Sequence, residues 1–226
     1  MRRSTWLDGA FIAGRLATVL LGRAASEPKP LLVGLGGDGG LGKTSLGEQI
    51  RGIDDSILLI STDGFLRDRK DRGGYALGEC SDSKFTNFPP LLNSISEALG
   101  RGSNVIIPQY DHRRGSVGSV KMFDASRCRC IIVEGSIVAN PIMWPMFDIR
   151  LLIDGPDGTR RRLRRVVDLN ERGYTAAQFR SQWRYHLAAY RNVIAPRRQI
   201  ADLCLDVSKD RQYKVAGGSL ASSLRW

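Results

Sequence analysis

The chain has 226 residues, a hydrophobic fraction of 42% and a formal net charge of +11, most of it from arginine. The length suits one domain with a sizeable core, and the composition is that of a soluble protein rather than a disordered one. The apolar stretch 10–21 contains Arg15 and is too short to cross a bilayer, which excludes a membrane-spanning segment there. The positive charge leaves nucleic acid, membrane surfaces and anionic small molecules open as partners.

The cysteines and histidines of the chain indicate its redox environment and whether it could hold a zinc ion. The four cysteines are Cys80, Cys128, Cys130 and Cys204. They are widely spaced, and the chain has only two histidines, so the sequence predicts free thiols and no zinc site. Reduced thiols favour a cytoplasmic location.

The first predicted elements are a helix, a buried strand and a glycine-rich loop. Apolar residues recur at helical spacing over residues 5–24, and residues 1–28 form a predicted N-terminal helix and linker. Residues 31–33 then predict a buried strand, followed by a loop that fits the pattern G-x-x-x-x-G-K-[ST] and a helix from Lys43.

This loop predicts a phosphate-binding site. Glycines let backbone N–H groups turn inward around a phosphate, and the helix that follows points its positive end at the same place. Lys43 would neutralise the β- and γ-phosphates, and the Thr44 hydroxyl would bind Mg²⁺. The predicted nucleotide-binding residues are Gly37, Asp38, Gly39, Gly40, Leu41, Gly42, Lys43, Thr44 and Ser45.

The middle of the chain alternates strands with helices. Residues 56–60 predict a strand that ends before Asp63, and residues 64–90 an aperiodic excursion on the acceptor side. A helix is predicted over residues 89–99 and a third strand over 104–107. Residues 113–127 read as a loop with a short strand near Val120.

The last part of the chain predicts further strands and an arginine-rich helix. Residues 130–133 form a predicted strand that ends in Glu134, and residues 148–153 form another. An arginine-rich helix within 159–173 reads as a lid. Then come a helix over 176–193, a strand over 203–207 and a weakly patterned, peripheral segment, 208–226.

This alternation predicts an α/β fold with a mostly parallel central sheet and helices on both faces. Ligands then bind beyond the carboxyl ends of the strands, where Asp63 and Glu134 should meet the glycine-rich loop. One carboxylate could accept a proton from an attacking hydroxyl, and the other could help to hold Mg²⁺.

In these residues the chain resembles the uridine kinase, phosphoribulokinase and bacterial pantothenate kinase group of P-loop kinases. The resemblance lies in the phosphate loop, in Thr62-Asp63-Gly64-Phe65, in residues 107–112, in Glu134-Gly135 and in the arginine-rich segment ending at Gly173. It implies a P-loop fold of the nucleoside-monophosphate-kinase type with an arginine-rich lid helix.

The resemblance implies a kinase that uses ATP and Mg²⁺ to phosphorylate a hydroxyl of a nucleoside, sugar or pantothenate-like acceptor. The resemblance implies that Asp63 is the catalytic base and that Thr44 and Glu134 bind the metal ion. It implies that Arg164 and Arg172 are lid residues. Arg161 and Arg165 are further candidates for the lid. The acceptor contacts that the resemblance indicates are Asp63, Arg67, Tyr110 and His112. The family's phenylalanine-aspartate-x-proline pattern is missing between residues 67 and 87, so the expected acceptor is not uridine.

Alternatives remain open on the residues alone. The basic charge would also suit a nucleic-acid-binding P-loop ATPase or a polynucleotide 5′-hydroxyl kinase, although no interleaving of basic and aromatic residues favours a stacking platform. A third alternative is a protein that binds nucleotide without transferring phosphate. The expected partner is a small molecule and not a membrane, and a homodimer stays open.

Overall fold

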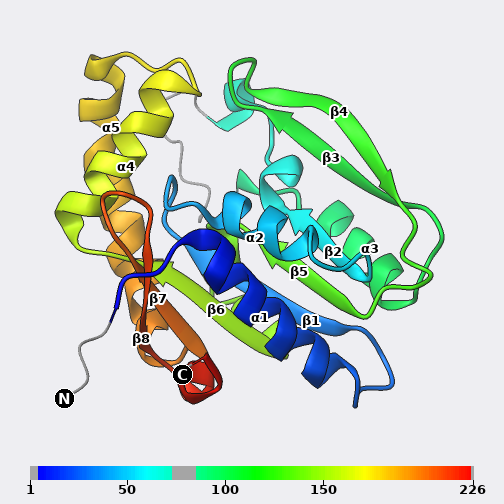
Figure 1. Ribbon diagram of the computed structural model, residues 1–226. Helices are drawn as coiled ribbons and strands as arrows, with labels where there is room; N and C mark the ends of the chain where they lie inside the picture. Colours follow the sequence, from blue (N-terminus) through cyan, green and yellow to red (C-terminus); the bar gives the residue numbers. More distant parts are fainter. Residues whose placement is uncertain (1–4, 73–84, 225–226) are drawn as a thin grey trace.

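The computed structural model describes residues 5–72 and 85–224 and has a six-stranded sheet at its centre (Figure 1). The strands, in spatial order, are β2 (Ile57–Ser61), β5 (Cys130–Glu134), β1 (Leu31–Gly37), β6 (Ile149–Asp154), β7 (Leu203–Val207) and β8 (Tyr213–Gly217). All neighbours pair in parallel except β7 and β8, which are antiparallel. The predicted mostly parallel sheet is therefore confirmed.

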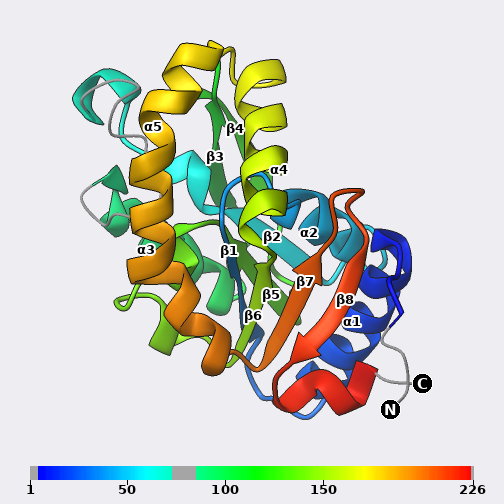
Figure 2. The same ribbon diagram turned by 90° about the vertical axis from the view of Figure 1, so that its left-hand side faces the viewer.

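Helices cover both faces of this sheet (Figures 1 and 2). They are α1 (Gly9–Ala24), α2 (Lys43–Arg51), α3 (Phe88–Leu99), α4 (Asp157–Asn170) and α5 (Ala176–Ala189). The predicted 176–193 helix ends its α-helical part at Ala189 and continues as a π-helical turn, Tyr190–Ile194.

The five parallel strands, β2, β5, β1, β6 and β7, are largely buried, so each sends alternate residues into two cores. Leu31, Val33 and Leu35 of β1 pack with α1 and α2, while Leu32 faces the other core. The first core includes Leu16 and other apolar residues of α1, which confirms that the N-terminal helix packs on the sheet. The second core is built from α3, the start of β3 and the segment that precedes β6.

The third predicted strand does not belong to the central sheet. β3 (Val105–Asp111) pairs with β4 (Ser116–Phe123) in a separate antiparallel hairpin. The short strand predicted near Val120 is therefore confirmed, but it is longer than predicted and replaces the loop over Ser116–Phe123. The sequence pattern misled because β4 lies on the surface, where no core imposes an apolar alternation.

The C-terminal segment is not peripheral, which corrects the prediction for residues 208–226. β8 adds an antiparallel edge strand to the sheet, and the 3₁₀ turn Ser219–Leu224 packs on α1. Tyr213, Leu220 and Leu224 are buried in the same core as α1. The tail completes one face of the sheet.

Part of the predicted acceptor-side excursion, 64–90, lies outside the described residues, as does Cys80. Its described ends contain two 3₁₀ turns, Thr62–Phe65 and Arg69–Arg72. Cys128, Cys130 and Cys204 are buried free thiols, as predicted, and burial raises the pKa of Cys130 to about 12. No helix in the described part of the chain has the length and apolarity needed to span a membrane.

Candidate active site

A cleft of about 670 Å³ opens at the carboxyl ends of β1, β2 and β5. Residues of the phosphate loop, Asp63, Glu134, the β3–β4 hairpin and the end of α4 line it. Figure 1 shows α4 and α5 on one side of the phosphate loop and the hairpin on the other. The cleft thus lies where the topology of a parallel sheet predicts a ligand.

The phosphate loop runs from the end of β1 into α2. Gly42 at the N-cap of α2 has φ +89°, a left-handed conformation that glycine adopts without steric cost, and no side chain caps the helix. The orphan N–H groups of the first turn are therefore available to an anion. Lys43 is buried beside them, with Nζ 2.9 Å from the carbonyl oxygen of Asp38. Burial lowers the pKa of Lys43, while Glu134 and Asp63 oppose that shift.

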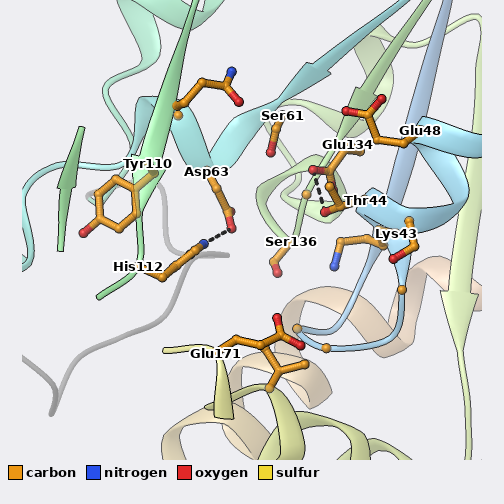
Figure 3. Close-up of a pocket in the computed structure, with 18 of the residues that line it drawn as sticks. Lys43, Thr44, Glu48, Ser61, Asp63, Tyr110, His112, Glu134, Ser136 and Glu171 are labelled. Carbon is orange, nitrogen blue, oxygen red and sulfur yellow. Dashed lines mark hydrogen bonds and ion pairs between the residues drawn. The ribbon is translucent and has the colours of Figure 1, made fainter. Parts of the chain in front are cut away.

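Thr44 and Glu134 form a pair of oxygen donors at the floor of the cleft. Thr44 Oγ1 donates to Glu134 Oε1 at 3.0 Å, and Glu134 is only 2% exposed (Figure 3). Burial raises the pKa of Glu134, and the nearby Lys43 partly offsets that rise. A buried carboxylate next to a hydroxyl suits a hard divalent cation, whose charge would compensate the burial of the carboxylate.

A complete protein cage for a metal is absent from residues 5–72 and 85–224, where no group of three or more His, Cys, Asp or Glu side chains converges. This fits Mg²⁺, which usually takes one or two protein ligands and completes its shell with water and substrate phosphates. Thr44 and Glu134 are the residues that could hold it.

Asp63 faces this floor from the end of β2 and is paired with the hairpin. Its Oδ2 lies 3.1 Å from His112 Nε2, and the two side chains point toward each other across the cleft wall in Figure 3. Burial alone would raise the pKa of Asp63. The hydrogen bond and charge of His112, with Arg172 and Lys43 further away, instead hold it well below its usual value.

Gly64 explains how Asp63 comes so close to the hairpin. A Cβ at this position would collide with the carbonyl oxygen of Pro108 in β3. Only glycine lets the 3₁₀ turn after β2 pack directly on the hairpin backbone. The Thr-Asp-Gly-Phe sequence therefore fixes the distance between Asp63 and His112.

Two arginines of the predicted lid meet at one buried aspartate. Asp168 Oδ2 accepts from Arg164 Nε at 2.8 Å, and its Oδ1 accepts from Arg172 Nη1 at 3.2 Å. Arg164 Nη2 also donates to Nε2 of the buried His186 at 3.2 Å. The Arg164 guanidinium packs against Gly39, where a Cβ would leave it no room. α4 and the turn that follows it thus bring two positive groups to the cleft: Arg164 on the helix, directly against the phosphate loop, and Arg172 two residues beyond the helix end.

A third arginine, Arg160 in the first turns of α4, connects this helix to Asp38 of the phosphate loop. It is fully buried, with Nη1 3.1 Å from Asp38 Oδ2, and it also pairs with Asp157. Its guanidinium lies 3.2 Å from the ring centroid of Tyr190. Arg160 therefore holds Asp38 and the helix in place and does not line the cleft.

The structure brings most of the predicted site residues together. Those that line the cleft are Gly39, Gly40, Gly42, Lys43, Thr44, Ser45, Asp63, Tyr110, His112, Glu134, Arg164 and Arg172. Gly37, Asp38 and Leu41 support the loop from behind; Leu41 is fully buried in the core.

Three predicted residues lie elsewhere. Arg67 is exposed and does not line the cleft; its carbonyl oxygen accepts from Arg72 Nε at 2.8 Å. Arg161 and Arg165 point away on the exposed side of α4, with Arg161 near the Trp183 ring. One helix face cannot carry all the arginines of a run, because successive residues are about 100° apart.

Several cleft residues are not among the predicted site residues, although Gln109 lies in the 107–112 segment that carries the family resemblance. Gln109, Arg113 and Lys121 come from the hairpin, and Arg211 comes from the turn after β7. Arg72 lies behind the wall, where it donates to the Tyr110 hydroxyl at 2.7 Å. Once β4 is recognised as a strand, the polar residues 119 and 121 fall on one face of it, and residue 119 pairs with Gln109 of β3. That pattern could have indicated the polar face of the hairpin.

Comparison with known families decides the class of this site. The model of the "Phosphoribulokinase / Uridine kinase family" matches residues 32–214, which is most of the chain. The chain belongs to the phosphoribulokinase/uridine kinase family. The family's P-loop kinase fold agrees with the sheet and the cleft described above, and the predicted resemblance is confirmed.

Individual relatives are 25–30% identical to this chain, and the matched share of their length varies widely. The chain is 30% identical over 125 residues to the inorganic pyrophosphatase TTM2 of Arabidopsis thaliana, which covers 55% of this chain but only 18% of the relative. The chain thus matches less than a fifth of that protein's length. It is 25% identical over 207 residues to the uridine kinase of Ligilactobacillus salivarius, covering 85% of this chain and 92% of the relative.

A solved structure with the same fold is D-glycerate 3-kinase from Cryptococcus neoformans. Its TM-score is 0.68 at 15% identity, and the match covers 91% of this chain and 98% of that one. At this level of identity the likeness concerns the fold alone. It shows that the sheet, the phosphate loop and the covering helices form one established arrangement.

Proposed function

We propose that this protein is a small-molecule kinase that transfers the γ-phosphoryl group of ATP to a hydroxyl group of its acceptor. The observation that carries the proposal is the position of Asp63. Its carboxylate faces Lys43 and the Thr44–Glu134 pair across one cleft (Figure 3). A proton acceptor opposite a phosphate cradle is what phosphoryl transfer to an alcohol requires.

The phosphate loop would bind the triphosphate through the N–H groups at the start of α2 and through Lys43. Thr44 and Glu134 would hold Mg²⁺, which neutralises charge on the phosphates when it is bound. Lys43 and Glu134 are buried, so their charges interact more strongly than they would in bulk solvent. The loop and its floor thus supply the donor half of the site.

Asp63 would orient the acceptor hydroxyl and take its proton. His112 keeps the carboxylate ionised and fixes its direction, since the two groups are hydrogen-bonded. A carboxylate with a lowered pKa is a weak base. That suits a loose transition state, in which the hydroxyl loses its proton late and positioning supplies most of the catalysis.

Arg164 and Arg172 would stabilise the charge that spreads over the transferred group. Both line the cleft, and Asp168 holds them at a fixed separation. The segment 159–173 then acts as a lid whose inner face carries these two residues, within a single kinase domain spanning 1–226. Arg161 and Arg165 are left out of this role, because neither lines the cleft.

The acceptor is a polar molecule that the β3–β4 hairpin recognises. The inner side of the hairpin presents Tyr110, His112 and Lys121 to the cleft. None of its exposed large apolar side chains lines the cleft; they are Ile106, Val117, Val120 and Met122. A hairpin that covered an apolar ligand would show the opposite pattern.

The test is a screen for acceptor-dependent release of ADP with Mg²⁺ present. The acceptors are nucleosides, sugars, sugar phosphates, glycerate, pantothenate and an oligonucleotide with a free 5′-hydroxyl. We expect one small-molecule class to be phosphorylated and the oligonucleotide to be inert. Turnover of the oligonucleotide alone would replace the proposal with a polynucleotide kinase.

Two variants make the test specific for the site. Lys43→Ala should abolish transfer and weaken ATP binding, because the loop loses its buried cation. Asp63→Asn should lower kcat by about 10²–10⁴-fold, the usual contribution of a positioned base, while ATP affinity stays within about threefold. Normal turnover by Asp63→Asn with the identified acceptor would show that Asp63 is not the base.

A further inference from the structure

The turn between β7 and β8 brings Arg211 to the phosphate loop. Arg211 lines the cleft, and its Nη1 lies 3.9 Å from the place where a Cβ would stand on Gly42. It forms no ion pair with any residue that the structure describes. An uncompensated guanidinium therefore lies next to the N-terminus of α2, beside the predicted site of the triphosphate.

The backbone at Arg211 has an unusual conformation for an arginine. Its φ is +60°, in the left-handed region that residues with a Cβ rarely adopt. The turn holds it there: Arg211 N donates to the Ser208 carbonyl oxygen at 3.1 Å, and Ser208 Oγ accepts from Asp210 N and Gln212 N. Glycine would fit this position without strain, so the arginine side chain needs an explanation other than the turn itself.

The position of this turn is fixed from two sides. Tyr213 pairs with Val207 of β7, and it also exchanges both backbone hydrogen bonds with Leu7, at 2.7 and 2.8 Å. Its buried side chain reaches the phosphate loop, with the hydroxyl 3.5 Å from the Gly42 carbonyl oxygen. Arg211 is thus held against the loop by strand pairing and is not carried by an unsupported loop.

The direction of approach indicates which ligand Arg211 meets. The β7–β8 turn lies on the side of the phosphate loop away from the β3–β4 hairpin, which carries the acceptor wall (Figure 1). Arg211 also comes from a different element than Arg164 and Arg172. A guanidinium matches phosphate oxygens with two parallel hydrogen bonds.

The geometry points to Arg211 as a binding residue for the phosphate chain of the donor nucleoside triphosphate. It completes a ring in which α2 supplies backbone N–H groups, α4 and the turn after it supply Arg164 and Arg172, and the β7–β8 turn supplies a third cationic group. This inference deepens the proposed function and rests on it, because it takes the phosphate loop as the donor site.

The test measures binding to the full chain by calorimetry, with ATP, inorganic tripolyphosphate and adenosine as separate probes. The variants are Arg211→Ala, Arg211→Gly and Arg211→Lys, with Arg23→Ala in the exposed last turn of α1 as the charge-matched control. We expect Arg211→Ala and Arg211→Gly to weaken the binding of ATP and tripolyphosphate about ten- to hundredfold, in the range of a charged hydrogen bond. Adenosine binding should not change, and Arg211→Lys should retain part of the affinity.

Arg211→Gly separates binding from a structural role. It should melt at the same temperature as the wild type or higher, because glycine takes the same φ without strain, and yet it should bind tripolyphosphate weakly. If both truncations bind tripolyphosphate as tightly as Arg23→Ala does, the inference is overturned. Failure of the proposed function would look different, since the wild type would then bind ATP and phosphorylate no acceptor.

Discussion

At the scale of single residues, the pairing of Asp63 with His112 governs how the site responds to pH. The pKa of Asp63 is lowered in the folded protein although burial opposes this shift. A carboxyl with a lowered pKa stabilises the folded state above its ordinary pKa, about 3.9, and loses that contribution as the pH falls through the folded-state value. The pair therefore stabilises the fold at neutral pH and stops doing so in acid.

This sign gives a prediction for acid unfolding. On acidification from about pH 6 to about pH 3, the wild type should lose more stability than Asp63→Asn, because the asparagine variant has no carboxylate to protonate. Melting temperatures at a series of pH values measure the difference. Parallel curves for the two proteins would mean that His112 does not lower the pKa of Asp63.

Residues that act through local sequence were predictable, and residues that act through the tertiary fold were not. Lys43, Thr44 and Glu134 sit in short motifs directly after buried strands, so their meeting follows from the sheet topology alone. Arg67 is in a motif-poor segment and does not line the cleft, so its predicted acceptor contact stays a prediction. Arg211 could not be found, because its position depends on how β8 pairs with β7.

At the scale of elements, α4 and the turn after it present two arginines that share one carboxylate, that of Asp168 on the helix. Asp168 is fully buried, and burial would raise its pKa, but Arg164 and Arg172 lower it overall. Without this carboxylate, two neighbouring guanidinium groups would repel each other at the edge of the cleft. Asp168 is thus a positioning residue for the proposed lid.

Removing that carboxylate should affect stability and turnover together. We expect Asp168→Asn to lower the unfolding free energy by about 3–5 kcal/mol, the usual cost of breaking a buried ion pair. kcat with the identified acceptor should fall, since Arg164 and Arg172 lose their orientation. Thermal unfolding and steady-state kinetics below the melting transition check both effects.

Arg161→Ala is the matched control on the same helix. Arg161 is exposed, and its removal should change the unfolding free energy by less than about 0.5 kcal/mol and leave kcat unchanged. Equal losses in both variants would mean that the arginine run acts as a whole through its charge, and not through the Asp168 pair.

The hairpin shows where element prediction from sequence fails. β3 was recognised as a strand because it begins with the buried Val105 and Ile107, but β4 exposes nearly every residue. An exposed strand has no periodic apolar pattern in its sequence. It is recognised only from its pairing with a neighbouring strand. As a result the sequence predicts only a short strand near Val120 in the wall that carries Lys121.

At the scale of the whole molecule, the sheet is completed by its two chain ends. α1 and the turn Ser219–Leu224 pack together on one face, and Leu7 near the N-terminus pairs with Tyr213 in β8. The α/β class was predictable from the alternation of strands and helices. The packing of the C-terminal tail was not predictable. Its few apolar residues form no periodic pattern, and they are buried only because α1 packs against them.

This packing leads to a prediction for Leu220, which is 2% exposed and packs in the core beside α1. Leu220→Ala should lower the unfolding free energy by about 2–5 kcal/mol, because it removes buried methyl groups and leaves a cavity. For a chain of this size that corresponds to a fall of about 5–15 °C in melting temperature. The exposed Ser222 in the same turn provides the control: Ser222→Ala should melt within about 2 °C of the wild type. A tail that only rests on the surface would give both variants the same small change.

Arg211 and Leu220 flank the same strand, β8. A destabilised tail should therefore also weaken tripolyphosphate binding as the temperature approaches the melting transition. This loss should come well before the β3–β4 side of the cleft is affected.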